Sequence, residues 1–179
     1  MHSSIADFIS DIIENSIESG ASSVIVDIIE ENRVLRVYIA DNGSGMDEDT
    51  LSKIKDPFYT GGAKHQHRKV GLGIPFIIQA VEAVNGEFDI KSEKGYGTSV
   101  YFSFDLSHID SPPLGDIIKT TLFSMAFDGN YELVVNRHKN GKKYSVLRSD
   151  LLSALGEIQS ADSLILAKNF ISSLEEELN

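Results

Sequence analysis

The stretch KDPFYTGGAKHQHRKVGL, residues 55–72, carries a charge opposite to that of the rest of the chain. The 179 residues have a formal net charge of -11, whereas five of the six residues from 64 to 69 are basic or titratable: Lys64, His65, His67, Arg68 and Lys69. Gly61-Gly62 and Gly71-Leu72-Gly73 flank this basic segment. Glycine lets a backbone approach a phosphate closely, and the free amides at the start of a helix attract negative charge. We therefore expect a lid over a nucleotide triphosphate.

The segments on either side of the lid predict the fold. Before it, apolar residues recur at helical spacing between residues 5 and 17, and two β-branched strands follow at residues 23–29 and 34–40. A short helix is expected at residues 47–54. After the lid, a helical pattern covers residues 74–84, and strands follow at residues 87–92 and 98–105. Helices on one face of a mixed, mainly antiparallel sheet make an α+β fold, a two-layer α/β sandwich.

The first predicted helix carries a polar stripe beside its apolar one. Residues 4–7 fit a capping box, and Gly20 ends the helix. Asp11 and Asn15 lie on the polar stripe, one turn apart. Such a stripe is commonly a solvated face, but asparagine is a poor helix former whose amide oxygen can ligate magnesium. We therefore predict a magnesium ligand at Asn15, with Asp11 holding a water or a further contact beside the same ion.

Asp41 directly follows the second predicted strand and begins the segment Asp41-Asn42-Gly43-Ser44-Gly45-Met46. Two glycines in three positions indicate a tight loop with positive φ angles. An ordinary turn can have the same Asp-Asn-Gly tripeptide. At the end of a buried strand, however, the carboxylate is well placed to accept a hydrogen bond from an exocyclic amine such as that of adenine.

Composition excludes several classes of protein. With 41% hydrophobic and 24% charged residues, the chain supports one good core and a small second one. No apolar run approaches the roughly 20 residues that span a bilayer, and the N-terminus lacks a secretory pattern, so we expect no membrane contact and a cytoplasmic location. The absence of cysteine excludes disulfides and thiolate metal sites. The acidic balance disfavours binding of nucleic acid through bulk charge.

Four segments, in order and at suitable gaps, resemble the GHKL superfamily of ATPases, which includes DNA gyrase, heat-shock chaperones, histidine kinases and MutL. Residues 11–28, DIIENSIESGASSVIVDI, resemble the N box of MutL and the type VI topoisomerases, and residues 41–46 resemble the G1 box. Pro57-Phe58-Tyr59-Thr60 resembles the F box of histidine kinases. Gly71-Leu72-Gly73-Ile74 resembles the G2 box, with Gly95-Tyr96-Gly97-Thr98 as its closing element. The resemblance implies the Bergerat ATP-binding fold for a histidine-kinase-like domain at residues 1–106.

The resemblance also implies a role for each matched residue. Asn15 would ligate the Mg2+ that bridges the phosphates of ATP, Asp41 would bind the adenine amino group, and Thr98 would join the water network around Asp41. Further nucleotide contacts would come from the adenine pocket and the lid: Gly43, Gly45, Met46, Lys64, Arg68, Gly71, Leu72 and Gly73. Closure of the lid over ATP, and its opening when the γ-phosphate leaves, is the implied conformational switch.

The chain departs from the hydrolysing members of this superfamily at the catalytic general base. Those members carry a glutamate four residues before the magnesium asparagine, and Asp11 stands at that position here. Aspartate is one methylene shorter than glutamate, so its carboxylate lies about 1 Å short of the position of the glutamate carboxylate. Such a misplacement of the general base can lower the rate on the order of 100-fold. Glu14 cannot replace it because it faces another side of the helix.

Residues 107–179 form a small predicted α+β extension that we assign to no family. Ser111-Pro112-Pro113 indicates a linker, and we expect helices at residues 114–127, 149–155 and 161–178. Two strands, residues 131–136 and 143–147, flank an Asn-Gly turn. Their basic tip, residues 137–143, resembles the wing of a winged-helix module and leaves nucleic-acid binding open. The alternative interpretation is a charged, exposed hairpin. It would belong to a subdomain that packs on the ATPase sheet or mediates a homodimer.

Three functions fit these patterns. The first is a regulatory Mg-ATP-binding module of kinase type in signal transduction, which acts on a separate partner protein. Because His2 is the only histidine before the N box, we expect the phosphoryl acceptor on another chain. The second is an ATP-gated conformational switch with little phosphoryl transfer, which Asp11 favours. The third is a MutL- or topoisomerase-like ATPase, which the N box suggests and the short lid opposes.

Overall fold

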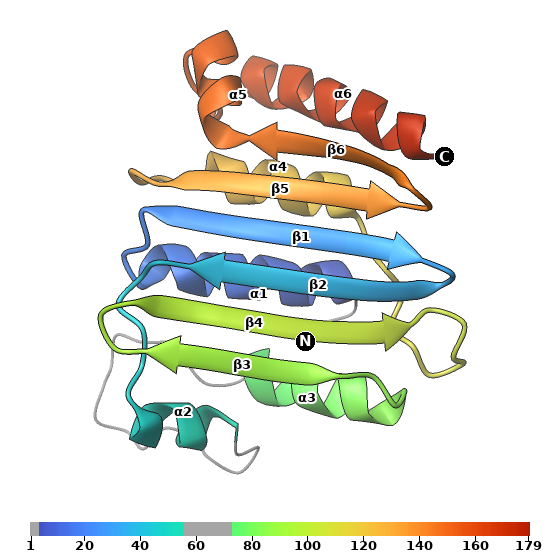
Figure 1. Cartoon of the computed structure of the whole chain (residues 1–179). Coiled ribbons are helices and arrows are strands. Elements are labelled where there is room, and N and C mark those ends of the chain that lie inside the picture. The colour runs from blue at the N-terminus through green and yellow to red at the C-terminus, as the bar shows by residue number, and fades with distance from the viewer. Residues whose placement is uncertain (1–3, 56–72) are drawn as a thin grey trace.

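The structure, a computed structural model of the chain, describes residues 4–55 and 73–179. It contains a six-stranded sheet with the strand order β3-β4-β2-β1-β5-β6 (Figure 1). The strands are β1 (Ser23–Glu31), β2 (Val34–Asp41), β3 (Phe88–Glu93), β4 (Gly97–Asp105), β5 (Glu132–Lys139) and β6 (Lys142–Leu147). Only the pair formed by β1 and β5 is parallel among the neighbouring pairs of this sheet. The expected mixed, mainly antiparallel sheet is confirmed.

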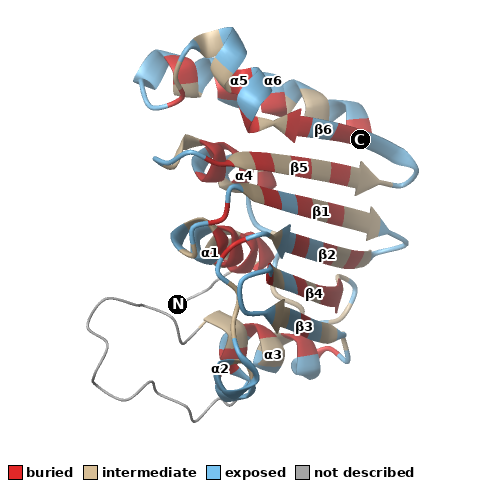
Figure 2. Cartoon of the chain, turned by 60° about the vertical axis from the view of Figure 1, so that its left-hand side comes forward, coloured by how far each residue is buried: buried red, intermediate tan, exposed pale blue. Residues whose placement is uncertain are grey.

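Within the described residues, the helices pack on one face of the sheet and none covers the other face (Figure 2). The helices in the described part of the chain are α1 (Ile5–Glu18), α2 (Glu48–Ile54), α3 (Gly73–Ala83), α4 (Ile117–Ala126), α5 (Arg148–Leu155) and α6 (Ala161–Leu178). Helix α1 lies behind β1 and β2 in Figure 1, with α3 and α4 on its two sides. None of these helices has both the length and the apolar character that crossing a bilayer requires.

Helix α1 forms the centre of the helical layer. Its sequence specifies both where the helix starts and which side is buried. The capping box is confirmed: the Asp7 amide donates to Ser4 Oγ at 3.3 Å, and the Ser4 amide donates to Asp7 Oδ2 at 2.9 Å. The isoleucines of the apolar stripe are buried against the sheet: Ile5, Ile9, Ile12 and Ile13. Full burial of each such side chain stabilises the fold by about 1.5–3 kcal/mol.

The first hairpin is tighter than the sequence pattern suggests. Its turn consists of Asn32 and Arg33 alone, with φ angles of 51° and 65°. A two-residue turn with positive φ at both positions matches the twist of antiparallel strands, so β1 and β2 continue to the turn. The strands therefore extend beyond the predicted residues 23–29 and 34–40, and β2 includes Asp41.

The segment after residue 106 continues the same sheet. Strand β5 pairs with β1 from Ser23 opposite Glu132 to Glu30 opposite Lys139. The predicted linker lies against α1, because the Ile5 amide donates to the Pro113 carbonyl at 2.9 Å. The division into a domain at residues 1–106 and an extension at residues 107–179 stays a prediction, to which we return in the Discussion.

The basic hairpin of β5 and β6 belongs to the main sheet and is therefore not the wing of a separate module. Arg137 is fully buried and forms ion pairs with Glu30 and Glu175. Lys142 Nζ donates to the Glu177 carbonyl at 3.0 Å. Since these cations bind the last turns of α6, the hairpin holds the acidic end of that helix on the sheet.

Candidate functional site

Asp41 joins three elements at one end of the sheet. It ends β2 and lies directly opposite Thr98 on β4. Its Oδ1 accepts hydrogen bonds from the Gly43 amide at 2.8 Å and the Thr98 amide at 3.2 Å. Its Oδ2 accepts one from Ser16 Oγ of α1 at 2.7 Å. The carboxylate is therefore fixed in rotation and in position.

These bonds leave the Asp41 carboxylate with room for one more donor. An ionised carboxylate offers about four acceptor positions, two on each oxygen. Donors among the described residues occupy both positions on Oδ1 and one on Oδ2. One acceptor position, on Oδ2, has no donor among the described residues.

The glycine loop, residues 42–46, is wedged between the end of α1 and the β3–β4 hairpin. A Cβ on Gly43 would lie 1.9 Å from Ser19 Oγ, and a Cβ on Gly45 would lie 1.9 Å from the Glu93 carbonyl oxygen. The contact at Gly45 is with backbone, and Gly45 also has a φ of 59°, so this position requires glycine. At Gly43 the contact is with the Ser19 side chain, which would have to move to admit a Cβ.

A second serine, Ser92 of β3, anchors the end of the glycine loop. The Met46 amide donates to Ser92 Oγ at 2.9 Å, and Ser92 Oγ shares a 2.8 Å hydrogen bond with Thr98 Oγ1. Thr98 therefore contacts Asp41 through its amide and the loop through its hydroxyl. Residues Asp41, Gly43, Gly45, Met46 and Thr98, which the sequence predicts to be functional, form one connected cluster.

Sequence reasoning missed Ser16 and Ser92. Ser16 lies on the apolar stripe of α1 in step with Ile9 and Ile12, and a buried serine there has to find a hydrogen-bond partner. The place of Ser16 on this apolar stripe could have been recognised from the sequence. Ser92 has no comparable pattern, because its role depends on its register opposite Thr98.

Asp11 lies beside the start of α3. A Cβ on Gly73 would come within 2.8 Å of Asp11 Oδ2, so these two predicted residues are brought together across the helical layer. Asn15 is exposed one turn further along α1. The predicted lid residues Lys64, Arg68, Gly71 and Leu72, and the segment 57–60, lie outside the described residues.

No group of three or more acidic, histidine or cysteine side chains in residues 4–55 and 73–179 is arranged to hold a metal ion.

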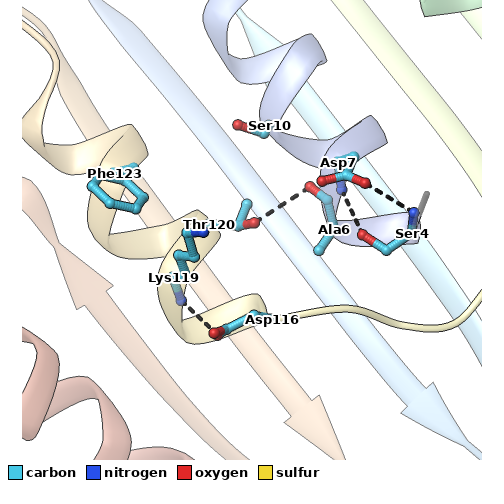
Figure 3. A pocket seen from close by; sticks show the side chains of 8 residues that line it. All are labelled: Ser4, Ala6, Asp7, Ser10, Asp116, Lys119, Thr120 and Phe123. Atoms are coloured by element: carbon cyan, nitrogen blue, oxygen red, sulfur yellow. Dashed lines mark hydrogen bonds between the residues drawn. The ribbon is translucent and has the colours of Figure 1, made fainter. Parts of the chain in front are cut away.

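The described part of the structure contains two hollows, one on strands of the sheet and one between two helices. A shallow one of about 350 Å³ is lined by Asp41, Thr98 and neighbours such as Lys91 and Ser99. The other, about 200 Å³, lies between α1 and α4 (Figure 3). Three of its polar side chains cap the two helix starts: Ser4 and Asp7 cap α1, and Asp116 Oδ1 accepts a hydrogen bond from the Lys119 amide of α4 at 2.8 Å.

Comparison with known proteins agrees with this arrangement. Residues 3–108 match the family described as histidine kinase-, DNA gyrase B- and HSP90-like ATPase. The chain is 34% identical over 91 residues to Sporulation kinase E of Bacillus subtilis, which covers 49% of this chain and 12% of that kinase. It is 28% identical over 137 residues to Sensor histidine kinase AtsR of Burkholderia thailandensis, which covers 68% of this chain and 23% of that kinase. The chain thus spans less than a quarter of these relatives.

The fold itself has a counterpart among solved structures. The N-terminal domain of a DNA repair protein superimposes with a TM-score of 0.56 at 13% identity, over 91% of this chain and 59% of that chain. Such coverage extends beyond residue 108, so the shared fold includes part of the segment that contains β5 and β6.

The family match covers more than half of the chain and includes the whole cluster around Asp41. The chain belongs to the histidine kinase-, DNA gyrase B- and HSP90-like ATPases and is an ATP-binding domain of the histidine-kinase-like type.

Proposed function

We propose that the chain binds Mg-ATP between α1, the glycine loop and the start of α3, and acts as a regulatory kinase-type module on a separate protein. The observation that carries this proposal is the single acceptor position left on Asp41 Oδ2. The 6-amino group of adenine is a donor of the right kind, whereas guanine places a carbonyl oxygen there and would be repelled. The site should therefore prefer ATP to GTP.

The phosphate end of the nucleotide would lie along α1, near the start of α3. Asn15 fits a magnesium ligand because its amide is exposed, and it is one turn from Asp11. Bound Mg2+ would neutralise charge on the phosphates. The amides at the start of α3, from Gly73, are oriented to attract anions. Lys64, Arg68, Gly71 and Leu72 complete the proposed phosphate contacts, as the family resemblance implies.

The positions of the described histidines support a separate phosphoryl acceptor. His108 comes after β4, and His138 lies opposite Ile29 on β5. Both are at the end of the sheet away from Asp41 and Thr98. Neither lies near the proposed phosphate position, which supports the part of the proposal that places the phosphoryl acceptor outside the described residues.

Asp11 supports a second candidate function, an ATP-gated conformational switch with little phosphoryl transfer. Its carboxylate already lies against Gly73, and it is one methylene shorter than the glutamate of hydrolysing relatives. In that case the binding of ATP, and not its turnover, would alter contacts with the partner.

The experiment that tests both candidates measures magnesium-dependent ATP binding by calorimetry and phosphate release, on wild type, Asp41→Asn and Asp11→Glu. Asparagine can keep the bonds from Gly43 and Thr98, but it presents an N–H₂ group toward Ser16 and the adenine amine. We expect ATP affinity to fall on the order of 100-fold in Asp41→Asn while the fold persists.

Asp11→Glu separates the two candidates. A gain of turnover over an inactive wild type supports the switch or a need for a partner, and transfer of labelled phosphate to a co-purified protein supports the kinase-type module. Steady phosphate release by wild type would show that Asp11 is an adequate base. If wild type binds no adenine nucleotide, the proposed function is wrong.

A further inference from the structure

Ser16 is a buried polar side chain that no role proposed above uses. It lies on the apolar stripe of α1 and is only 3% exposed. Its Oγ donates to Asp41 Oδ2 at 2.7 Å, across 25 residues of sequence. A hydroxyl has a single proton to donate, so in this arrangement the proton of Ser16 is directed at Asp41.

This hydrogen bond decides where the last acceptor position of Asp41 points. The Gly43 and Thr98 amides hold Oδ1, but on their own they leave Oδ2 free to accept a donor from either of its two directions. Ser16 fills one of these directions from the helix side. The remaining direction is thereby defined before any ligand arrives, which lowers the cost of binding a donor there.

The end of α1 and the glycine loop are joined by further contacts. Ser19 Oγ donates to the Ser16 carbonyl at 2.8 Å, and the Ser44 amide donates to the Ser19 carbonyl at 3.1 Å. Ser19 Oγ also occupies the space in which a Cβ on Gly43 would lie. Since Asn15 directly precedes Ser16, these contacts fix the proposed magnesium ligand relative to Asp41.

We propose that the Ser16 hydroxyl is a positioning group that directs the free acceptor of Asp41 toward the 6-amino group of a bound purine. Ser16 thereby contributes to the selection of adenine nucleotides over nucleotides that lack this amine. The inference rests on the proposed function, because it requires that a purine nucleotide binds at Asp41.

The test compares two ligands on the full chain, ATP and purine riboside triphosphate, which lacks the 6-amino group. We expect Ser16→Ala to weaken ATP binding about tenfold and to change binding of the analogue less than about twofold. A merely structural role would weaken both ligands by the same factor. Ser10→Ala is the matched control, since it removes a hydroxyl from the same helix and should leave both affinities unchanged.

A second variant keeps the volume of the side chain. Ser16→Cys replaces the hydroxyl by a weak donor of similar shape, so it should show the same selective loss without a cavity. Thermal melting of each variant confirms that it is folded. Equal ATP affinity in wild type, Ser16→Ala and Ser16→Cys would overturn the role of Ser16 and leave the nucleotide site intact. Failure of wild type itself to bind ATP would instead overturn the proposed function.

Discussion

Gly95 and Gly97 stand two residues apart near the candidate site and have different surroundings. Both have a positive φ, 86° at Gly95 and 117° at Gly97. A Cβ on Gly97 would lie 2.0 Å from the Asp41 carbonyl oxygen, whereas a Cβ on Gly95 would meet nothing within 4 Å. A substitution strains the backbone at both positions, and at Gly97 it also clashes with β2.

Alanine substitutions at Gly95 and Gly97 therefore compare a strained position without the clash with one that has it. We expect Gly95→Ala to lower the free energy of unfolding by about 1 kcal/mol, from strain alone. Gly97→Ala should lower it by about 3 kcal/mol, because the alanine methyl pushes Asp41 away, and ATP affinity should fall with it. Urea denaturation of both variants gives the comparison. Equal losses would mean that the close approach of Gly97 to Asp41 does not hold in solution.

At the residue scale, the sequence allowed the glycines and acids of the site to be predicted, but not their supports. Asp41, Gly43 and Gly45 occur in one short segment whose composition already indicates a loop at the end of a strand. Ser16 and Ser92 come from other elements, and each contacts this segment only through tertiary packing. Hydrogen bonds between residues so distant in sequence produce no local sequence pattern. The exception is Ser16, which stands out as a serine on an apolar stripe.

At the scale of elements, helix α6 depends on a carboxylate that caps its start. Glu157 Oε2 accepts hydrogen bonds from the Gln159 amide at 2.6 Å and the Ser160 amide at 2.8 Å, and Oε1 accepts one from Ser163 Oγ at 2.9 Å. The bonds with Ser160, then those with Ser163 and Gln159, lower the pKa of Glu157 from 4.5 to about 2. The ionised form is thus the one that caps α6.

This lowered pKa sets the pH range in which the cap acts. A depressed carboxyl pKa contributes stability that is present above the unfolded-state value, near 4.5, and that is lost as pH falls toward about 2. We expect Glu157→Gln to flatten the dependence of the urea midpoint on pH in this range. Glu176→Gln, at an exposed position of the same helix, is the control. An unchanged slope in Glu157→Gln would contradict the capping role.

Element boundaries differ from the sequence predictions where tertiary contacts decide them. The fourth helix was expected to begin at Leu114, but α4 begins at Ile117, with Asp116 as its cap. The Pro113 and Leu114 carbonyls instead accept hydrogen bonds from the first amides of α1. Pro113 and Leu114 therefore cap a helix that is distant in sequence, which local propensity cannot indicate.

At the scale of the whole molecule, residues 107–179 complete the sheet that begins in the first part of the chain. Strand β1 has β2 on one side and β5 on the other. Helix α4 packs between α1 and α6, and its buried Leu122 and Met125 belong to the same core as the residues of α1. The sequence predicted the elements of this segment, but not that β5 pairs with β1.

A shortened chain of residues 1–106 tests the predicted domain boundary. Without β5, the parallel edge of β1 is unpaired and part of the apolar surface of α1 is uncovered. We expect this fragment to lack a cooperative thermal transition and to aggregate, while the full chain unfolds in a single step. Calorimetric scans of both make the comparison. A fragment that melts cooperatively and binds ATP would establish residues 1–106 as an independent domain.

The pairing of β1 with β5 has a consequence for synthesis on the ribosome. Partners such as Asp27 and Asn136 are 109 residues apart, so β1 leaves the exit tunnel well before its neighbour has been translated. At roughly 5–20 residues per second, the nascent chain exposes this strand for several seconds. During that interval an apolar strand with an open edge is a substrate for chaperones, and a premature stop codon would leave it in that condition permanently.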